Sequence, residues 1–138
     1  MVESNHPRGL IDTSVVIDLD AIDPADLPAD LTISAVTLAE LAAGPHAVTD
    51  PGERAWRQER LQWIEATLEP LPVDSAVARA YGRVYAAVAA AGRQHRGRAF
   101  DLLIAATALA AGLPLYTSNS SDFDGLADLI EVVAVAPR

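Results

Sequence analysis

Short apolar runs alternate with longer helical segments along almost the whole chain, and this alternation constrains the fold more than any other feature. The predicted strands are 9–11, 31–33, 71–73, 115–117 and 130–135, and the predicted helices are 15–19, 35–43, 51–68, 76–91 and 99–111. Thr13 or Ser14 is the predicted cap of the first helix and Ser34 that of the second, and the segments 20–28 and 118–124 are predicted loops. Such alternation predicts an α/β protein in which helices cover both faces of a short, mostly parallel central sheet. We therefore expect a three-layer α/β/α sandwich.

The chemistry open to this chain is narrow because two reactive residue types are missing. The sequence contains no cysteine, which excludes disulfides, zinc–thiolate sites and cysteine nucleophiles. All ten basic residues are arginine, so mechanisms that need a lysine ammonium are excluded as well. The three histidines are scattered, without metal-ligand spacing. Carboxylates are left as the main source of chemistry.

Length and charge suggest how the chain is organised and where it works. At 138 residues it fits one domain, 1–138, with 1–7 as a short N-terminal tail. The net charge of −9 repels nucleic acid at long range and favours a basic partner or a metal ion, although a local arginine patch can reverse the sign. We expect no membrane span and a cytoplasmic location, because the longest apolar run, 102–111, is about half of the roughly 20 residues that a span needs.

Four acidic residues occupy positions from which they can meet. Asp12 directly follows the first predicted strand, and Glu40 lies about two turns into the helix after the second. Asp101 is in the first turn of the helix 99–111, and Asp122 is in the loop after the strand 115–117. Ligand sites of parallel sheets lie at the carboxyl ends of the strands, so we expect these side chains to converge at one edge.

Each acid alone also has a structural explanation. Asp12 fits a turn or cap, Glu40 an ion pair with an arginine, Asp101 the positive end of its helix dipole, and Asp122 an ordinary polar turn. A cluster is harder to explain that way, because two unit charges about 4 Å apart repel by about 4 kcal/mol at an effective dielectric of 20. Such a cluster takes up protons or binds a cation, and oxygen ligands alone favour Mg²⁺ or Mn²⁺ over zinc.

The residues around these acids resemble a known family. The segments 10–15 (Leu-Ile-Asp-Thr-Ser-Val), 34–44, 101–108 and 117–123 are similar in order and spacing to those of PIN-domain ribonucleases, in particular the VapC-type toxins of bacterial toxin–antitoxin pairs. Each motif alone is modest, whereas the four in this order are quite specific. The resemblance covers the chain from about residue 8 to residue 135.

The resemblance implies a Mg²⁺-dependent endoribonuclease that an antitoxin protein inhibits and that forms a homodimer. Carried over by motif, Asp12 and Asp101 are the central metal ligands, and Glu40 and Asp122 complete the acidic pocket. Thr13 and Asn119 match polar positions that orient a water or a carboxylate, with helix capping and turn formation as the alternatives. We expect hydrolysis of RNA by metal-activated water, leaving a 5′-phosphate and a 3′-hydroxyl.

Several arginines and tryptophans are candidates for contacts. Arg93, Arg96 and Arg98 lead into Asp101, and we predict that they position the RNA backbone; a solvated loop or ion pairs with the acids are the alternatives. The spacing of Arg54, Arg57 and Arg60 predicts a solvated helix face, with substrate contact as the alternative. Trp56 and Trp63 are expected in the core or in an interface.

Two other functions compete with the nuclease. A haloacid-dehalogenase-like phosphatase would use the run 15–20 as an opening strand with an aspartate nucleophile, but such enzymes usually need a lysine against the phosphate. A non-catalytic interaction module would use the acidic pocket only to dock a basic peptide.

Overall fold

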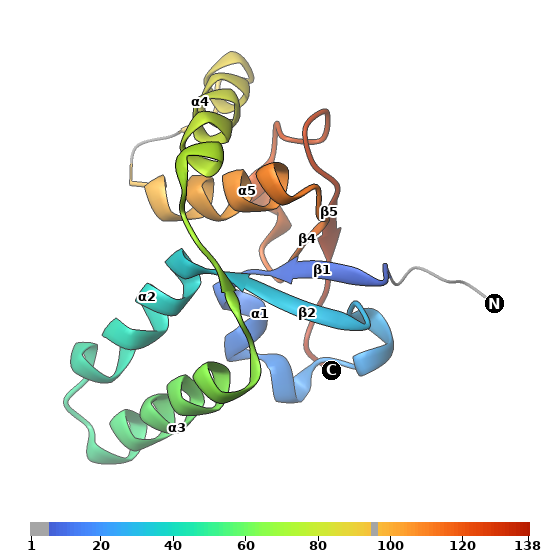
Figure 1. Cartoon of the computed structure of the whole chain (residues 1–138). Helices are drawn as coiled ribbons and strands as arrows, with labels where there is room; N and C mark the ends of the chain where they lie inside the picture. The colour runs from blue at the N-terminus through green and yellow to red at the C-terminus, as the bar shows by residue number, and fades with distance from the viewer. Residues whose placement is uncertain (1–5, 95–96) are drawn as a thin grey trace.

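The computed structural model describes residues 6–94 and 97–138 and shows a five-stranded, wholly parallel sheet (Figure 1). The strand order is β3-β2-β1-β4-β5. The strands are β1 (Arg8–Ile11), β2 (Asp30–Ser34), β3 (Pro70–Leu71), β4 (Leu115–Thr117) and β5 (Val132–Ala134). The predicted α/β class and parallel sheet are confirmed.

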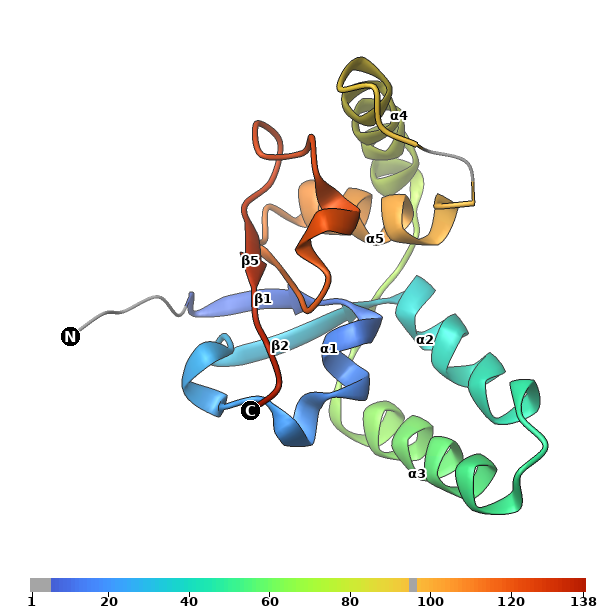
Figure 2. The same ribbon diagram turned by 180° about the vertical axis from the view of Figure 1, so that it is seen from behind.

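Helices cover both faces of this sheet, as the sandwich prediction requires. The α-helices are α1 (Thr13–Ile17), α2 (Ala35–Ala43), α3 (Pro51–Thr67), α4 (Ser75–Ala90) and α5 (Ala99–Ala111). Helices α4 and α5 lie on one side of the sheet and α1 and α3 on the other, while α2 projects from the edge where β2 ends (Figures 1 and 2). Each side has its own apolar core, so the molecule consists of three layers.

Neighbouring residues of the central strands point into different cores. Leu10 and Leu115 pack with α4 and α5, whereas Ile11 and Tyr116 pack with α1 and α3. This is the two-residue period of a strand that is buried on both faces. Glycine is required at position 9 in β1, because a Cβ there would lie 2.6 Å from a ring carbon of Tyr116.

Helix α5 has the predicted bounds and the predicted apolar circumference. Among its buried residues are Leu102, Ile104 and Ala108, which pack between α4 and the sheet. It ends at Gly112, whose φ of +68° is a left-handed cap conformation that favours glycine. In the described residues, no helix is both long and apolar enough to cross a lipid bilayer.

The structure corrects several local predictions. Helix α1 occupies 13–17 rather than 15–19, and its cap is Asp12 rather than Thr13 or Ser14. The segments 20–28 and 118–124, expected as plain loops, contain the 3₁₀ turns η1 (Leu19–Ala21), η2 (Pro24–Asp26) and η4 (Ser120–Phe123). The last strand is shorter than predicted, since only 132–134 pair with β4. Of the expected N-terminal tail, residues 1–5 lie outside the described residues.

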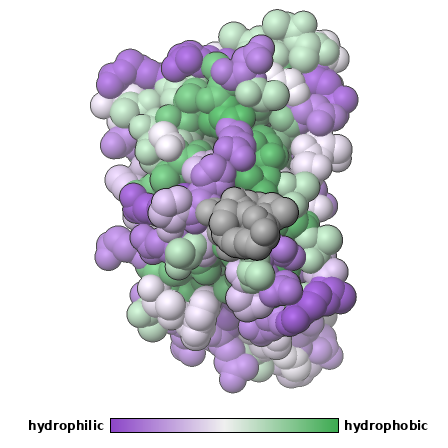
Figure 3. All heavy atoms as spheres, turned by 90° about the vertical axis from the view of Figure 1, so that its right-hand side faces the viewer, coloured by the Kyte–Doolittle hydropathy of each residue, from purple (hydrophilic) through white to green (hydrophobic). Residues whose placement is uncertain are grey.

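Figure 3 views the molecule from the side at the amino ends of the strands. Figure 3 shows apolar atoms between polar ones over its upper half, the layer of α4 and α5. A shallow hollow at the end of α5, lined by Leu109, Leu113 and Leu129 among others, lies in this region. The candidate catalytic acids are at the opposite edge, where β1, β2 and β4 end.

Candidate active site

Four elements bring the predicted acids to the carboxyl edge of the sheet. Asp12 follows β1, Glu40 lies in the second turn of α2, and Asp101 is the third residue of α5. Asp122 lies in η4, the turn after β4. In Figure 1 this edge is on the left, where α2 and α5 both begin. The acids come from distant parts of the sequence, so only the fold brings them to one place.

Asp12 is fixed by the start of α1. Its backbone N–H donates to the carbonyl of Tyr116 in β4 at 3.0 Å. Its carboxylate Oδ1 accepts from the backbone N–H of Val15 at 3.1 Å and from Ser14 Oγ at 2.6 Å. Ser14 Oγ also accepts from the backbone N–H of Ser118 at 3.0 Å. Both hydrogen bonds to this carboxylate use Oδ1, so the capping role does not occupy Oδ2.

Glu40 is held by a hydroxyl of the neighbouring helix. Thr13 Oγ1 donates to Glu40 Oε1 at 2.5 Å and also lies 3.1 Å from Thr37 Oγ1. A hydrogen bond to an ionised carboxylate is stronger than one between neutral groups. Thr13 therefore orients Glu40, and the capping alternative for Thr13 is wrong because Asp12 is the N-cap of α1.

Asp101 experiences the charges of the other three acids. The pKa of the Asp101 carboxyl is raised, and burial is the largest cause. The Asp122 carboxylate raises this pKa as well, Arg98 partly offsets the rise, and Glu40 and Asp12 make smaller contributions that raise it. Asp101 and Glu40 also line one open cavity of about 420 Å³, together with Gly97, Ala99 and Phe100. The four acids thus share one electrostatic environment.

Asp122 and its turn are held by arginines from the loop between α4 and α5. Arg98 Nη2 lies 3.3 Å from Asp122 Oδ1 and donates to the carbonyl of the same residue. Arg93 Nη2 lies 3.3 Å from Asp124 Oδ2 and donates to the carbonyl of Ser121 at 3.3 Å. The ion-pair alternative is therefore realised for Arg98, whereas Arg93 pairs with Asp124, which is not one of the four predicted acids. Arg96, the third predicted arginine, lies outside the described residues.

Asn119 occupies the turn before Asp122. Its backbone N–H donates to Thr117 Oγ1 at 2.9 Å, and its side chain makes no capping hydrogen bond to η4. The side chain is exposed. The contact agrees with turn formation, and the predicted role in orienting a water stays a prediction.

The donor chemistry of this edge fits a hard divalent cation. Four carboxylates supply oxygen ligands, and burial together with the neighbouring carboxylates raises the pKa of Asp101. Across residues 6–94 and 97–138, however, no three acidic or histidine side chains already stand close enough together to chelate an ion. The edge therefore has the negative charge that a metal site needs, but its carboxylates in the described residues are not yet close enough together to bind the ion.

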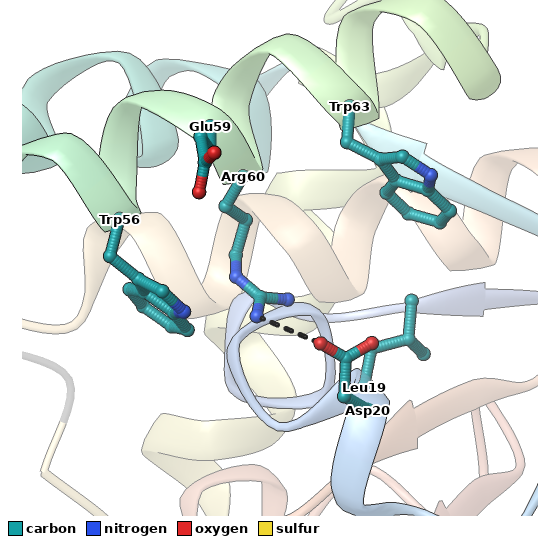
Figure 4. A pocket seen from close by; sticks show the side chains of 6 residues that line it. All are labelled: Leu19, Asp20, Trp56, Glu59, Arg60 and Trp63. Atoms are coloured by element: carbon teal, nitrogen blue, oxygen red, sulfur yellow. Dashed lines mark ion pairs between the residues drawn. The ribbon is translucent and has the colours of Figure 1, made fainter.

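A second hollow lies on the outer surface of α3, away from Asp101. Its lining includes Trp56 and Trp63, which are 41% and 47% exposed, so neither tryptophan is in the core and the interface alternative stays a prediction. Arg60 lies between them and is only 10% exposed. Its guanidinium stacks on Trp56 at 4.3 Å, donates to the carbonyl of Val16 and faces Asp20 at 3.6 Å (Figure 4). The prediction of a solvated arginine is wrong for Arg60, which joins α3 to the end of α1.

The fold removes the basis of the phosphatase alternative. That hypothesis needs the run 15–20 to be a strand that ends at a nucleophilic aspartate. Instead, Val15–Ile17 belongs to α1, Asp18 is the C-cap of that helix, and Asp20 lies in η1. Neither aspartate stands at the end of a strand.

Three further side chains at this edge were not among the predicted site residues. Ser14, considered only as a cap, links Asp12 to the chain after β4. Thr37 contacts Thr13, and it lies one helical turn before Glu40, a spacing that was available as a signal. Phe100 is exposed in the cavity that contains Asp101, and nothing in its sequence context distinguishes it from a core residue.

The three-layer fold with acids at the carboxyl edge of its sheet defines a class of protein. The pattern of the PIN domain matches residues 10–129, and the chain therefore belongs to the PIN domain family. Similar proteins indicate the group within this family to which the chain belongs. Ribonuclease VapC5 of Mycobacterium tuberculosis (strain ATCC 25618 / H37Rv) is 38% identical over 133 residues, which cover 92% of this chain and 95% of the relative. Within the family, the chain thus groups with the VapC ribonucleases.

Other proteins support this placement. Ribonuclease VapC8 of Mycobacterium tuberculosis (strain CDC 1551 / Oshkosh) is 36% identical over 109 residues, covering 78% of this chain and 96% of the relative. Among solved structures, VapBC-5 from Mycobacterium tuberculosis, a member of the VapBC family of toxin–antitoxin systems, superposes with a TM-score of 0.79. It is 36% identical and covers 94% of this chain and 99% of its own. FitAcB from Neisseria gonorrhoeae is 27% identical, with a TM-score of 0.69, and covers 89% and 94%.

Proposed function

We propose that this chain is the toxin of a toxin–antitoxin pair and that it hydrolyses RNA phosphodiester bonds with the help of Mg²⁺, for which Mn²⁺ is an alternative. The observation that carries the proposal is the position of Asp12, Glu40, Asp101 and Asp122 at one edge of the sheet, where burial and the other three acids raise the pKa of Asp101. The similarity to VapC ribonucleases over nearly the whole chain supports the same activity.

The chain's own residues have distinct tasks in this proposal. Asp12 and Asp101 hold the cation, and Glu40 and Asp122 complete the acidic pocket around it. Thr13 orients Glu40 through its hydroxyl, and the α1 cap orients Asp12. Arg98 holds Asp122 through side chain and backbone together. A bound divalent cation would supply positive charge to the scissile phosphate and to the hydrolytic water.

RNA can approach this edge although the whole molecule is acidic. Arg93 and Arg98 lie beside the acids, but both are engaged with the η4 turn. Their predicted role in positioning the RNA backbone, shared with Arg96, remains part of the proposal. A divalent cation would also lower the local negative charge against which a phosphate must bind.

The partner in this proposal is an antitoxin protein, and we place its contact on the α1–α3 surface formed by Ile17, Trp56, Arg60 and Trp63. Ile17, Trp56 and Trp63 are exposed large apolar side chains, and they border two adjoining hollows. Asp20 and Glu59 outnumber Arg60 in one of these hollows and leave it net negative, which suits a segment with apolar and basic side chains. Homodimer formation and a cytoplasmic location are further parts of the proposal.

The decisive experiment is cleavage of a total RNA pool by the purified chain. We expect Mg²⁺-dependent cleavage that leaves 5′-phosphate and 3′-hydroxyl ends, and loss of this activity on chelation and in Asp101→Asn. The matched control is Asp128→Asn, which removes an exposed carboxylate outside the cluster and should retain activity. Wild-type turnover by Asp101→Asn would refute the active site, and a chain that binds basic peptides without cutting RNA would be an interaction module.

A further inference from the structure

The most exposed large apolar side chain in the described part of the molecule is next to a candidate catalytic residue. Phe100 is 53% exposed, whereas Leu102, two positions further along α5, is 1% exposed. Full burial of a phenylalanine side chain is worth about 1.5–3 kcal/mol relative to exposure. An aromatic ring left in water at this place is therefore available to a binding partner.

The position of Phe100 ties that partner to the proposed reaction. The ring lines the cavity of about 420 Å³ whose wall also contains Glu40 and Asp101. Glu40 comes from α2 and Asp101 from the first turn of α5, so the cavity lies between two of the elements that carry the acids. A phosphate bound by these acids would therefore lie near the ring.

The exposed tryptophan side chains do not share this position. Trp56 and Trp63 lie on α3, and neither lines a hollow that contains Asp101, although one hollow of Trp56 reaches Glu40. Of the aromatic side chains in the described residues that line the hollows at the acids, Phe100 is the one beside Asp101. Its location therefore singles it out as a contact for the substrate.

We infer that Phe100 is a stacking platform for an unpaired base of the RNA next to the scissile phosphate. This inference rests on the proposed function and adds a base-binding subsite to it. Unpaired RNA bases are commonly bound by stacking on aromatic side chains, each worth about 1–3 kcal/mol. Because every base has a flat apolar face, Phe100 adds affinity for single-stranded RNA with little dependence on sequence.

Binding of RNA to the inactive Asp101→Asn protein tests this inference. The probe is a short single-stranded oligonucleotide that contains a cleavage site mapped in the RNA pool. We expect Phe100→Ala to weaken binding by about 5- to 150-fold, the equivalent of one lost stack. Phe100→Tyr and Phe100→Trp should bind like the parent, whereas Phe100→Leu, which keeps apolar area without a flat ring, should bind distinctly more weakly.

Abasic probes identify the stacked base. With the Asp101→Asn protein, an oligonucleotide that lacks the stacked base should bind more weakly, by the same factor as the Phe100→Ala substitution causes. When Phe100→Ala is already present, removing that base should not weaken binding further. Equal binding by Phe100→Ala and the parent would overturn the inference, as would equal binding by Phe100→Leu.

Mass measurements in solution test the competing occupant of this surface, a second copy of the chain. If Phe100→Ala converts a dimer to a monomer and RNA affinity falls only with that change, the ring is an interface residue and the inference is wrong. Unchanged mass together with weaker RNA binding supports it. Failure of the proposed function would be recognised by a different result: Asp101→Asn would still cleave RNA, or no cleavage site could be mapped.

Discussion

At the residue scale, adjacent side chains divide the work of the candidate site. Asp12 caps α1 through Oδ1, and Thr13, the next residue, sends its hydroxyl to Glu40 on α2. Ser14 then connects Asp12 to the backbone after β4. Thr13 and Ser14 thus orient Glu40 and Asp12, two of the four acids. The apparent conflict between a capping role and a functional role for Asp12 disappears, because the cap holds the carboxylate in place.

Substitution of Thr13 tests this arrangement. Thr13→Val keeps the shape of the side chain and removes the hydroxyl, so Glu40 loses a hydrogen bond of a kind worth about 1.5–3 kcal/mol. We expect kcat/KM for RNA cleavage to fall by about 10- to 100-fold, with the fall mainly in kcat. Thr13→Ser retains the hydroxyl and should restore most of the activity. Equal loss in the valine and serine variants would assign Thr13 to packing.

At the scale of elements, short segments are held in place by side chains from distant ones. Arg93 and Arg98, from the connection between α4 and α5, both donate to backbone carbonyls of η4. On the other side of the sheet, Arg60 of α3 donates to the carbonyl of Val16 near the end of α1. A one-turn helix and a 3₁₀ turn are marginal by themselves, so these contacts help to fix where Asp12 and Asp122 stand.

The outer surface of α3 gives a prediction about the antitoxin. Trp63→Ser removes an exposed indole from the α1–α3 surface, and we expect binding of the antitoxin to weaken by about 30-fold or more, as for an interface hot spot. RNA cleavage by the free chain should not change, because Trp63 does not line the cavity at Asp101. Calorimetry with the protein encoded by the neighbouring short reading frame measures the binding.

The matched control is Val73→Ser, which removes an exposed apolar side chain from the connection between β3 and α4. It should leave antitoxin binding intact. If Trp63→Ser and Val73→Ser bind equally well, the antitoxin contact lies elsewhere.

At the scale of the whole molecule, folding concentrates negative charge that the unfolded chain keeps apart. The net charge is −9, and four of the acids come together at one edge. Burial and these neighbours raise the pKa of Asp101, so its ionised form is disfavoured in the folded state. This unfavourable contribution to the free energy of folding arises at the edge where the proposed cation binds.

This cost predicts how stability depends on pH without metal. A carboxyl whose pKa is raised by folding contributes stability below its unfolded pKa, and that contribution is lost as the pH rises through the folded pKa. In chelating buffer, Asp101→Asn should therefore be more stable than the wild type at neutral pH, and the difference should shrink as the pH falls. Denaturant melts at neutral and acidic pH measure it.

Excess Mg²⁺ should stabilise the wild type and have much less effect on Asp101→Asn, since only a folded state that binds the ion gains from it. Asp128→Asn, again the control, should follow the wild type throughout. Lower stability of Asp101→Asn at neutral pH would mean that Asp101 supports the fold.

Local patterns in the sequence were sufficient for much of the fold. The bounds of α5 and β4, the Ser34 cap of α2 and the parallel sheet all follow from apolar spacing and from capping residues, which act within a few positions. The four acids could be named as well, because each stands at a fixed place after a strand or within a helix.

Contacts between elements were decided by the tertiary structure alone. The ion pair of Arg98 with Asp122, the burial of Arg60 and the exposure of Trp63 depend on how helices pack, which no local pattern encodes. The cavity that joins Phe100 to Asp101 and Glu40 arises in the same way. Spacing along the chain determines which face of an element a side chain is on, whereas its partners depend on the free energy of packing the whole molecule.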